Sequence, residues 1–340
     1  MLSIAKRVIA QISGDKRTVA LIVIAPLLIM TLLSLLLGDT DYIPSIAINE
    51  KKLPYALVSA LKLEEAVIVH IPDSVTDTEQ YLKDNKDIDA VLIISPSGPV
   101  ITMYEASNKS ALAMKAIQNA VTVLNPMMHI QTNFIIGNKD ESFFKSMGHV
   151  FLGIIAFFLI FIVAGIALVR ERSGGTLERM MMTGVKRSSV IGGYTIGYSL
   201  FAAIQAVVLV FFSVYVLGIH NEGSILWVVL IMILIAVAAV SFGELISIFA
   251  NNEFQVMQFI PIVIIPQIFF SGIIPVDTIP YKLGNLCYIM PIYYGCQAIR
   301  ELMFLGHGFR EIWQYVAALL VFIAVLSMLN TIALKKYRKL

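Results

Sequence analysis

The chain has 340 residues, of which 58% are hydrophobic and only 14% are charged, and its mean hydropathy is +0.82. Soluble domains carry roughly 25% charged residues, so this composition excludes an ordinary soluble protein and predicts a membrane protein. The net charge of +2 says little about partners, because basic and acidic residues are segregated along the sequence. No nucleic-acid partner is expected.

The N-terminal residues predict an interfacial helix followed by a first transmembrane helix. Apolar side chains recur at helical spacing within residues 1–17, at Leu2, Ala5, Val8, Ile9 and Ile12. This pattern is typical of an amphipathic helix on the cytosolic membrane surface. Residues 18–37 then form an apolar run of spanning length. A cleaved signal peptide is the competing interpretation, but the run is too long and no small-x-small cleavage site follows it, so a retained anchor is favoured.

Residues 38–147 predict a small α/β domain between the first and second transmembrane helices. This stretch is hydrophilic and net acidic, and it contains no arginine. Short β-branched runs predict strands at 45–49, 66–70, 90–94 and 100–104. Helical patterns alternate with them at 53–63, at 75–85, and from 108 toward 129. The domain is expected on the extracytoplasmic side.

Five further apolar segments are long enough to cross a hydrocarbon core of about 30 Å. They cover residues 148–169, 190–217, 225–250, 254–274 and 312–334. Lysine and arginine cluster before the first segment, within 170–187 and after the last. Six spans place these three regions on one side, which the positive-inside rule makes cytosolic. The sequence therefore predicts a mainly α-helical, polytopic cell-membrane protein with six transmembrane helices and both termini in the cytosol. Residues 148–340 would hold transmembrane helices 2–6.

The charged loop at 170–187 has the pattern of a docking element. Its candidate residues are Arg170, Glu171, Arg172, Gly174, Gly175, Thr176, Leu177, Glu178, Arg179 and Met180. The two glycines break the preceding helix, and Thr176 can cap a new short helix with Glu178 in its first turn. Leu177 and the methionines after Arg179 offer an adaptable apolar surface. In the alternative interpretation, the charges only anchor the spans and the glycines only form a turn.

The fifth span and the segment after it are unusual. Pro261 and Pro266 lie inside the span, and Ser271 and Gly272 end it; such residues are tolerated where neighbouring groups satisfy the broken backbone ladder. Residues 275–311 are too polar and interrupted for a clean span, so we expect short helices that enter the outer leaflet and return. Cys287 and Cys296 could form a disulfide there, although two free thiols are favoured.

Charged residues near the spans are gating candidates. Glu244 lies inside the fourth span, where carboxylates are costly and by default functional. It could pair with Arg170 or Arg172, or face water, and a structural or gating role is favoured over substrate contact. Arg300 and Glu301 precede the sixth span and could pair with each other or across a subunit interface.

The loop RERSGGTLERMMMTGVKRSSVIGGY resembles the stretch after the second span in permeases of type-2 ABC transporters. The motifs at 252–261, 270–275 and 291–301 also resemble that family's second half. The resemblance implies the membrane subunit of an exporter, with a separate ATP-binding-cassette ATPase, a second identical or similar permease chain and membrane lipid as partners. Residues 170–179 would be the coupling helix, and residues 1–16 the interfacial connecting helix.

No phosphate-binding Gly-x-x-x-x-Gly-Lys-Ser/Thr motif occurs in the sequence. The chain is therefore expected to bind no cofactor itself, and ATP and Mg²⁺ would bind to the partner ATPase. Ser173-Gly174-Gly175 echoes an ATPase signature only by coincidence. The five histidines are scattered, without metal-ligand spacing, and no catalytic motif is present. A transport subunit rather than an enzyme is expected.

The cargo of such an exporter is expected to be amphipathic or hydrophobic, such as a drug, a lipid or a lipopeptide. Aromatic and methionine side chains are frequent in the fifth span and the segment after it, and they suit such molecules. Simple helix packing is an equally good explanation of these side chains. A different function class also stays open, namely a membrane-anchored receptor or assembly protein whose outer domain binds a ligand. A neighbouring reading frame encoding an ATPase would favour the transporter.

Overall fold

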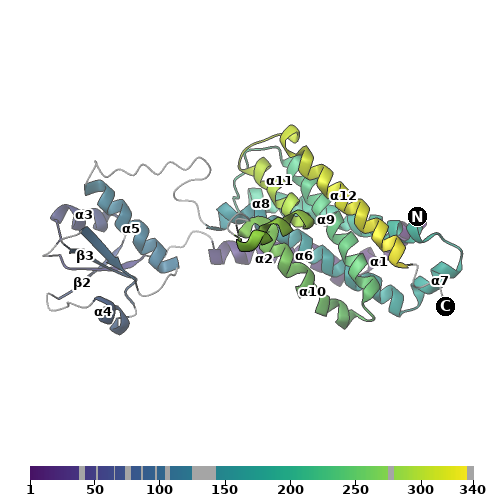
Figure 1. Ribbon diagram of the computed structural model, residues 1–340, viewed down its shortest axis with the longest axis horizontal. Coiled ribbons are helices and arrows are strands. Elements are labelled where there is room, and N and C mark those ends of the chain that lie inside the picture. Colours follow the sequence, from purple (N-terminus) through teal and green to yellow (C-terminus); the bar gives the residue numbers. More distant parts are fainter. Residues whose placement is uncertain are drawn as a thin grey trace. The chain divides into compact units, whose positions relative to one another are not determined.

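The computed structural model describes residues 1–37, 43–50, 53–64, 66–72, 78–85, 87–95, 98–103, 108–124, 143–274 and 279–334. The chain divides into two compact units (Figure 1). A helical unit comprises Met1–Asp39 and Ile135–Leu340, and an α/β unit comprises Thr40–Phe134. The basic residues after 334, and Pro275 in the expected re-entrant segment, lie outside the described residues.

Among its described residues, the helical unit contains six helices that are long and apolar enough to cross a membrane. They are α2 (Lys16–Leu37), α6 (Phe143–Ser173), α8 (Arg187–Tyr215), α9 (Ile225–Phe249), α10 (Glu253–Ile268) with the π-turn that extends it (Phe269–Ile273), and α12 (Phe309–Ala333). Each corresponds to one of the six apolar segments expected from the sequence. Length and hydropathy identify these spans because a helix of about 20 apolar residues is needed to cross the hydrocarbon core.

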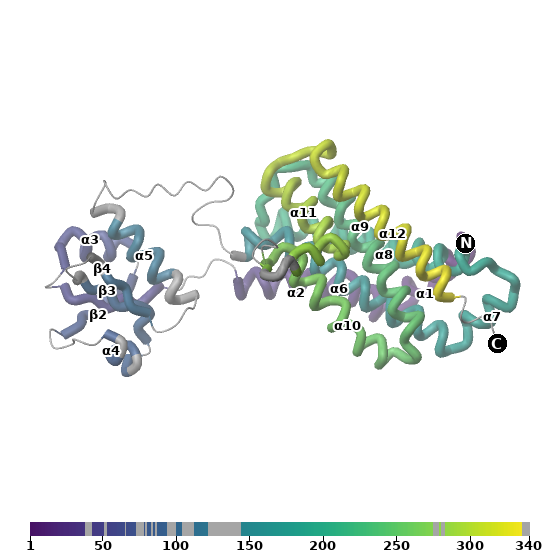
Figure 2. Tube along the Cα trace, in the orientation of Figure 1, coloured from purple at the N-terminus to yellow at the C-terminus, as the bar shows by residue number. Residues whose placement is uncertain are grey.

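Two short helices lie at one end of this unit, as Figure 2 shows. They are α1 (Leu2–Gly14), which precedes the first span, and α7 (Thr176–Met182), which lies between α6 and α8. After the fifth span come a 3₁₀ helix (Pro280–Ile289) and α11 (Pro291–Met303). Short helices were expected within this interrupted segment, and their entry into the outer leaflet stays a prediction. Cys287 and Cys296 are buried there and no disulfide joins them, as the sequence favoured.

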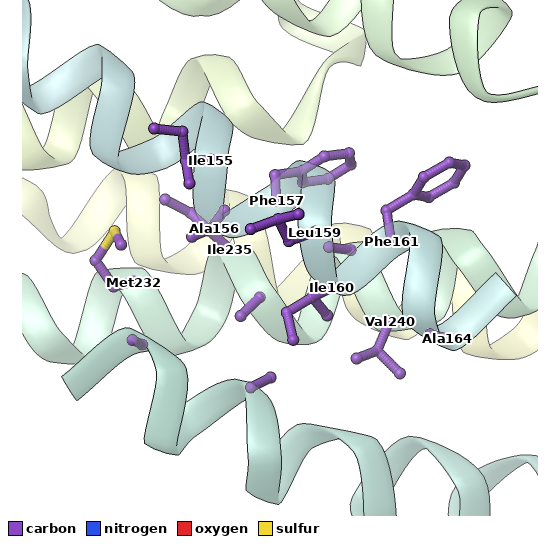
Figure 3. Close-up of a cluster of buried hydrophobic side chains, with 14 of the residues drawn as sticks. Ile155, Ala156, Phe157, Leu159, Ile160, Phe161, Ala164, Met232, Ile235 and Val240 are labelled. Atoms are coloured by element: carbon purple, nitrogen blue, oxygen red, sulfur yellow. The ribbon is translucent and has the colours of Figure 1, made fainter. Parts of the chain in front are cut away.

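α6 is the central helix of the unit. In its most apolar stretch of 18 residues, 72% is buried inside the protein, whereas the share is 17% for the corresponding stretches of α2 and α12. Its phenylalanine and isoleucine side chains, including Phe157 and Phe161, pack against α9 (Figure 3). The two helices approach closely at Gly243, where an added Cβ would lie 2.6 Å from the carbonyl oxygen of Phe161. The spans are thus organised around the α6–α9 pair.

The α/β unit holds a four-stranded sheet with the order β2–β1–β3–β4. The strands are β1 (Ser45–Ile48), β2 (Val67–His70), β3 (Ala90–Ser95) and β4 (Gly98–Thr102). β1 pairs in parallel with β2 and β3, and β3 pairs antiparallel with β4. The helices α3 (Tyr55–Leu63) and α5 (Asn108–Leu124) cover one face, and α4 (Thr78–Asp84) covers the other (Figure 1). The expected continuation of α5 toward residue 129 lies outside the described residues.

Candidate functional site

α7 begins with a left-handed turn. Gly175 occupies the cap position with φ of +68°, a conformation that glycine adopts without steric cost. Thr176 is therefore the first helical residue, and the expectation that it caps α7 is wrong. Its hydroxyl lies 3.5 Å from Nη2 of Arg179 instead. The reason is that Gly175, one residue earlier, already occupies the non-helical cap position in the turn after α6.

α7 has one buried anchor and an exposed outer face. Leu177 is only 1% exposed and belongs to the main hydrophobic core. Glu178 and Arg179 are exposed, and Met182 is 79% exposed. Glu178 lies in the first turn, where a carboxylate interacts favourably with the helix dipole. α7 therefore presents charge and a flexible apolar side chain outward from a fixed position.

Arg7 of α1 ties the first helix to α6 and α7. Its Nη2 lies 2.7 Å from Oε2 of Glu171, which is 6% exposed, and its Nη1 donates to Sδ of Met180 at 3.1 Å. Sequence reasoning used Arg7 only to orient the first span. Its position on the polar face of an amphipathic helix was a signal that it faces a partner, but the partner is 164 residues away in the chain.

α1 lies against glycines of α8. A Cβ added at Gly193 would lie 2.7 Å from the side chain of Ile4, and one at Gly197 would lie 2.6 Å from that of Val8. Glycine, which has no side chain, lets two helices approach this closely. The amphipathic pattern of α1 therefore finds its apolar contact partly on α8, which sequence reasoning did not identify.

The last turn of α6 holds the ends of two other spans. Arg170 donates from Nε and Nη2 to the two carboxylate oxygens of Glu253, at 2.9 and 3.1 Å, and so joins α6 to the start of α10. Arg172 donates from Nη1 to the carbonyl oxygens of Ser247 and Ile248, at 2.7 and 2.9 Å. Carbonyls at a helix end lack intrahelical partners, and an arginine near them is favourable. Glu171, Arg170 and Arg172 thus connect α6 with α1, α10 and α9.

Glu244 is fully buried among neutral hydrogen-bonding groups. Oγ1 of Thr195 lies 2.9 and 3.1 Å from its two carboxylate oxygens, and Nδ2 of Asn330 lies 3.4 Å from Oε2. Asn330 also donates to the carbonyl oxygen of Ser241 at 2.9 Å. Neither surrounding considered for Glu244 is found. Arg170 and Arg172 bind Glu253 and the α9 carbonyls instead, and the side chain of Glu244 is fully buried rather than facing water. Glu244 instead links α9 to α8 and α12.

The remaining candidates lie farther along the chain. α10 stays helical through Pro261 and Pro266, and the break comes at Gly272, whose φ is +107°. The hydroxyl of the buried Ser271, in that π-turn, donates to the carbonyl oxygen of Ile268, the last residue of α10, at 2.7 Å. These residues therefore shape the end of the fifth span and are not brought to the α7 site.

Glu301 pairs with His307, whose Nδ1 lies 2.6 Å from Oε2 of Glu301. The side chain of Arg300 is exposed. Of the two pairings considered for Arg300 and Glu301, the one with each other is wrong, because neighbours on a helix point in different directions, whereas the turn after α11 returns His307 to Glu301. The alternative, pairing across a subunit interface, stays a prediction.

Comparisons with known proteins agree with this architecture. The family model described as "ABC-2 family transporter protein" matches residues 16–332. ABC transporter G family member 20 of Dictyostelium discoideum is 27% identical over 63% of this chain and 30% of its own length. The probable multidrug ABC transporter permease YbhR of Escherichia coli is 25% identical over 48% of this chain and 45% of its own length.

The inner membrane transport permease YhhJ of Escherichia coli is 24% identical over 63% of this chain and 57% of its own length. The matches thus span between 30 and 57% of the lengths of these three curated relatives. The family match covers all six spans except Ala333, the last residue of α12, and begins after α1, so the chain belongs to the ABC-2 transporter family.

Proposed function

We propose that this chain is the permease subunit of an ATP-driven exporter, and that a separate ATPase docks on α7. The observation that carries the proposal is the form of α7, a short helix fixed by buried Leu177 while Glu178, Arg179 and Met182 face outward. A partner that binds this face can move α7 only together with the core to which Leu177 belongs. Family membership and the permeases named among the relatives support the same conclusion.

The ion pairs around α7 offer a path for the coupling. A displacement of α7 acts directly on α6, whose last turn is joined to α1 through Glu171, to α10 through Arg170 and to the end of α9 through Arg172. Packed elements joined in this way move as units because close-packed interiors do not deform continuously. ATP and Mg²⁺ would bind to the ATPase, and closure of its nucleotide site would be passed to four helices of the permease.

The charge distribution supports a cytosolic position for α7 and both termini, and an extracytoplasmic position for the α/β unit. Arginine and lysine lie before α2 and between α6 and α8, and basic residues favour the cytosolic side of short loops. Cell-membrane location follows from the same proposal. Two permease chains, identical or similar, would form the membrane unit, in contact with membrane lipid.

An amphipathic or hydrophobic cargo, such as a drug, a lipid or a lipopeptide, is supported by the aromatic side chains after the fifth span. Tyr288, Tyr293, Tyr294 and Phe322 form a continuous row in which neighbouring ring centroids lie 5.4–5.8 Å apart. Tyr288 is 57% exposed. Such rings combine an apolar face with a hydroxyl group, as an amphiphile requires. Outward transport and this cargo class are parts of the proposal.

Exposed variants of α7 test the docking. Glu178→Lys and Met182→Asp change only outward side chains, whereas Leu177→Asp would bury a charge in the core and confound folding with docking. The ATPase should co-purify with the wild-type chain, and each variant should retain about tenfold less of it, because one important interface contact is worth roughly 1–2 kcal/mol. The control is Glu222→Lys, the same charge reversal at a 58% exposed side chain between α8 and α9. Undiminished co-purification with both α7 variants would refute the docking assignment.

The receptor or assembly hypothesis rests on a different observation, the compactness of the α/β unit as a separate body. A receptor requires no ATPase and produces no ATP-dependent flux. Transport measurements on the purified components therefore separate the two function classes.

A further inference from the structure

A cavity of about 220 Å³ lies beside the turn between α1 and α2. Its walls come from the end of α1, the start of α2, the last turns of α6, and α8. Asp15, Thr18 and Arg170 contribute polar groups to the lining, and Leu21, Ile162 and Ile166 contribute apolar ones. The cavity is therefore amphipathic, and every wall belongs to the helical unit.

The polar and apolar parts lie at different depths along the spans. Arg170 follows the apolar run of α6, and Ile166 and Ile162 precede it by one and two helical turns. At 1.5 Å per residue, Ile162 lies about 12 Å deeper along α6 than Arg170. On α2, Asp15 immediately precedes the helix and Leu21 lies inside it. The cavity thus runs from the basic end of the spans into their apolar region, which is the arrangement of a phospholipid's headgroup and acyl chains.

Two opposite charges meet at the polar end. Thr18 donates to Asp15 from its hydroxyl at 2.7 Å and from its backbone at 3.3 Å, and these hydrogen bonds hold the pKa of the Asp15 carboxyl below its usual range. Asp15 is therefore ionised at neutral pH. Arg170 gives Nε and Nη2 to Glu253, while its Nη1 makes no hydrogen bond to any residue that the structure describes.

We propose that this cavity binds one phospholipid whose headgroup carries a primary ammonium beside a phosphate, as in phosphatidylethanolamine. The ammonium faces the carboxylate of Asp15, the phosphate faces Nη1 of Arg170, and an acyl chain lies along Leu21, Ile162 and Ile166. The lining contains one carboxylate, that of Asp15, and one guanidinium, that of Arg170, so a headgroup that carries both charges complements it better than a purely anionic one. A primary ammonium donates hydrogen bonds to a carboxylate, whereas choline carries no N–H and glycerol carries no charge.

The bound lipid would brace the α1–α2 turn against α6. Because Arg170 also holds Glu253 at the start of α10, the headgroup would adjoin the ion pair that joins α6 to α10. The lipid would act as a structural ligand of the permease, separate from its cargo.

Native mass spectrometry of the full-length chain tests the site. The purified protein is equilibrated with vesicles of equal parts phosphatidylethanolamine, phosphatidylcholine and phosphatidylglycerol with identical acyl chains. One retained lipid per chain is expected to be phosphatidylethanolamine, by about tenfold over each of the others, since a charge-assisted hydrogen bond contributes at least one factor of ten. Equal retention of the three lipids by the wild-type chain would overturn the proposal.

Two variants and one control locate the lipid. Asp15→Asn removes the charge but keeps a residue that caps helices equally well, so the preference for the ammonium headgroup should disappear. Leu21→Trp should reduce retention of every lipid at this site by filling the apolar part. Leu28→Trp is the control, because Leu28 is also exposed, at 55%, two turns farther along the same face of α2 and outside the cavity.

Two results would place the lipid elsewhere and overturn the assignment. One is that Asp15→Asn still prefers phosphatidylethanolamine as the wild-type chain does. The other is that Leu21→Trp still retains as much lipid as the wild-type chain. The assignment would also be overturned if Leu28→Trp lost as much bound lipid as Leu21→Trp. None of these readouts involves the ATPase, so the lipid site and the docking proposal succeed or fail separately.

Discussion

Glu244 shows how a carboxyl group is accommodated inside the helical unit. It is fully buried, and its partners are the hydroxyl of Thr195 and the side-chain amide of Asn330. Those two residues belong to α8 and α12, so one side chain of α9 holds three spans together. An isolated buried charge would be costly, and hydrogen bonds from neutral donors reduce that cost.

The interactions of Glu244 predict a difference between two substitutions. Glu244→Ala leaves a cavity and removes the acceptor for Thr195 and Asn330, so the free energy of unfolding should fall by about 2–4 kcal/mol. Glu244→Gln preserves size and an acceptor oxygen, and its loss should stay below about 1 kcal/mol. Unfolding in mixed detergent micelles measures both. A glutamine variant as unstable as the alanine variant would show that the carboxyl group itself is required.

Gly243 makes a second prediction at the residue scale. A Cβ there would lie 2.6 Å from the carbonyl oxygen of Phe161 and 2.9 Å from the backbone nitrogen of Gly165, both on α6. Because backbone atoms cannot yield as a flexible side chain does, Gly243→Ala should destabilise the helical unit by about 1–3 kcal/mol. Gly14→Ala is the control, since nothing lies within 4 Å of its added Cβ. Equal thermal midpoints for the two variants would contradict this close α6–α9 contact.

At the scale of elements, α1 is both an amphipathic helix and a packed part of the bundle. Its apolar side chains Ala5, Val8 and Ile12 are buried, and Gly193 and Gly197 of α8 admit it. The hydrophobic period predicted that α1 forms and which face is apolar. It could not predict the receiving surface, because a glycine inside a span has no periodic signature and the contact joins distant parts of the chain.

Closing the space on α8 should release α1. Gly197→Val places its side chain where Val8 lies, and Ala5, only 2% exposed, should then become accessible. A cysteine introduced by Ala5→Cys reports this through its rate of labelling by a water-soluble maleimide, which should rise about tenfold or more with Gly197→Val, because loss of the packed state exposes the site. Ile196→Val, at the adjacent 40% exposed position, is the control. Unchanged labelling with Gly197→Val would show that these glycines do not seat α1.

The charged end of α6 marks the limit of sequence reasoning at this scale. The loop pattern correctly placed a short helix after Gly174 and Gly175, because glycine pairs interrupt helices. The partners of its charges were not predictable, since Arg7, Ser247 and Glu253 approach only once the spans are packed. The pairing of Arg300 with Glu301 was wrong for a local reason, because neighbours on a helix point in different directions and the turn after α11 brings His307 to Glu301 instead.

At the scale of the whole molecule, hydropathy and charge were sufficient to predict the six spans and a separate α/β unit. Spans are recognisable because lipid demands long apolar helices, and the strands of the α/β unit have short β-branched runs. The arrangement of the spans was not predictable from these signals. α6 is the most enclosed of the six and α2 among the least, although their hydropathies of 3.1 and 2.8 are nearly equal.

The exposed spans predict an assembly of two permease chains. In the most apolar 18-residue stretch of each helix, only 17% is buried within one chain for α2 and for α12, and 22% for α10 with its π-turn. These helices leave apolar surface for lipid and for a second copy or a similar chain, since spans associate by packing rather than by escape from water. Chemical cross-linking and the mass of the purified complex should show two permease chains, and a single chain at working concentration would contradict the prediction.

ATP-driven flux is the most direct test of the central claim that this chain is the transport subunit coupled to a separate ATPase. Proteoliposomes holding the chain and its co-purifying ATPase are loaded with a fluorescent amphipathic probe, and probe movement is followed with and without ATP. Flux should require ATP and both proteins, should fall at least tenfold with Glu178→Lys, and should persist with Glu222→Lys. ATP-independent flux, or full flux with Glu178→Lys, would contradict the claim.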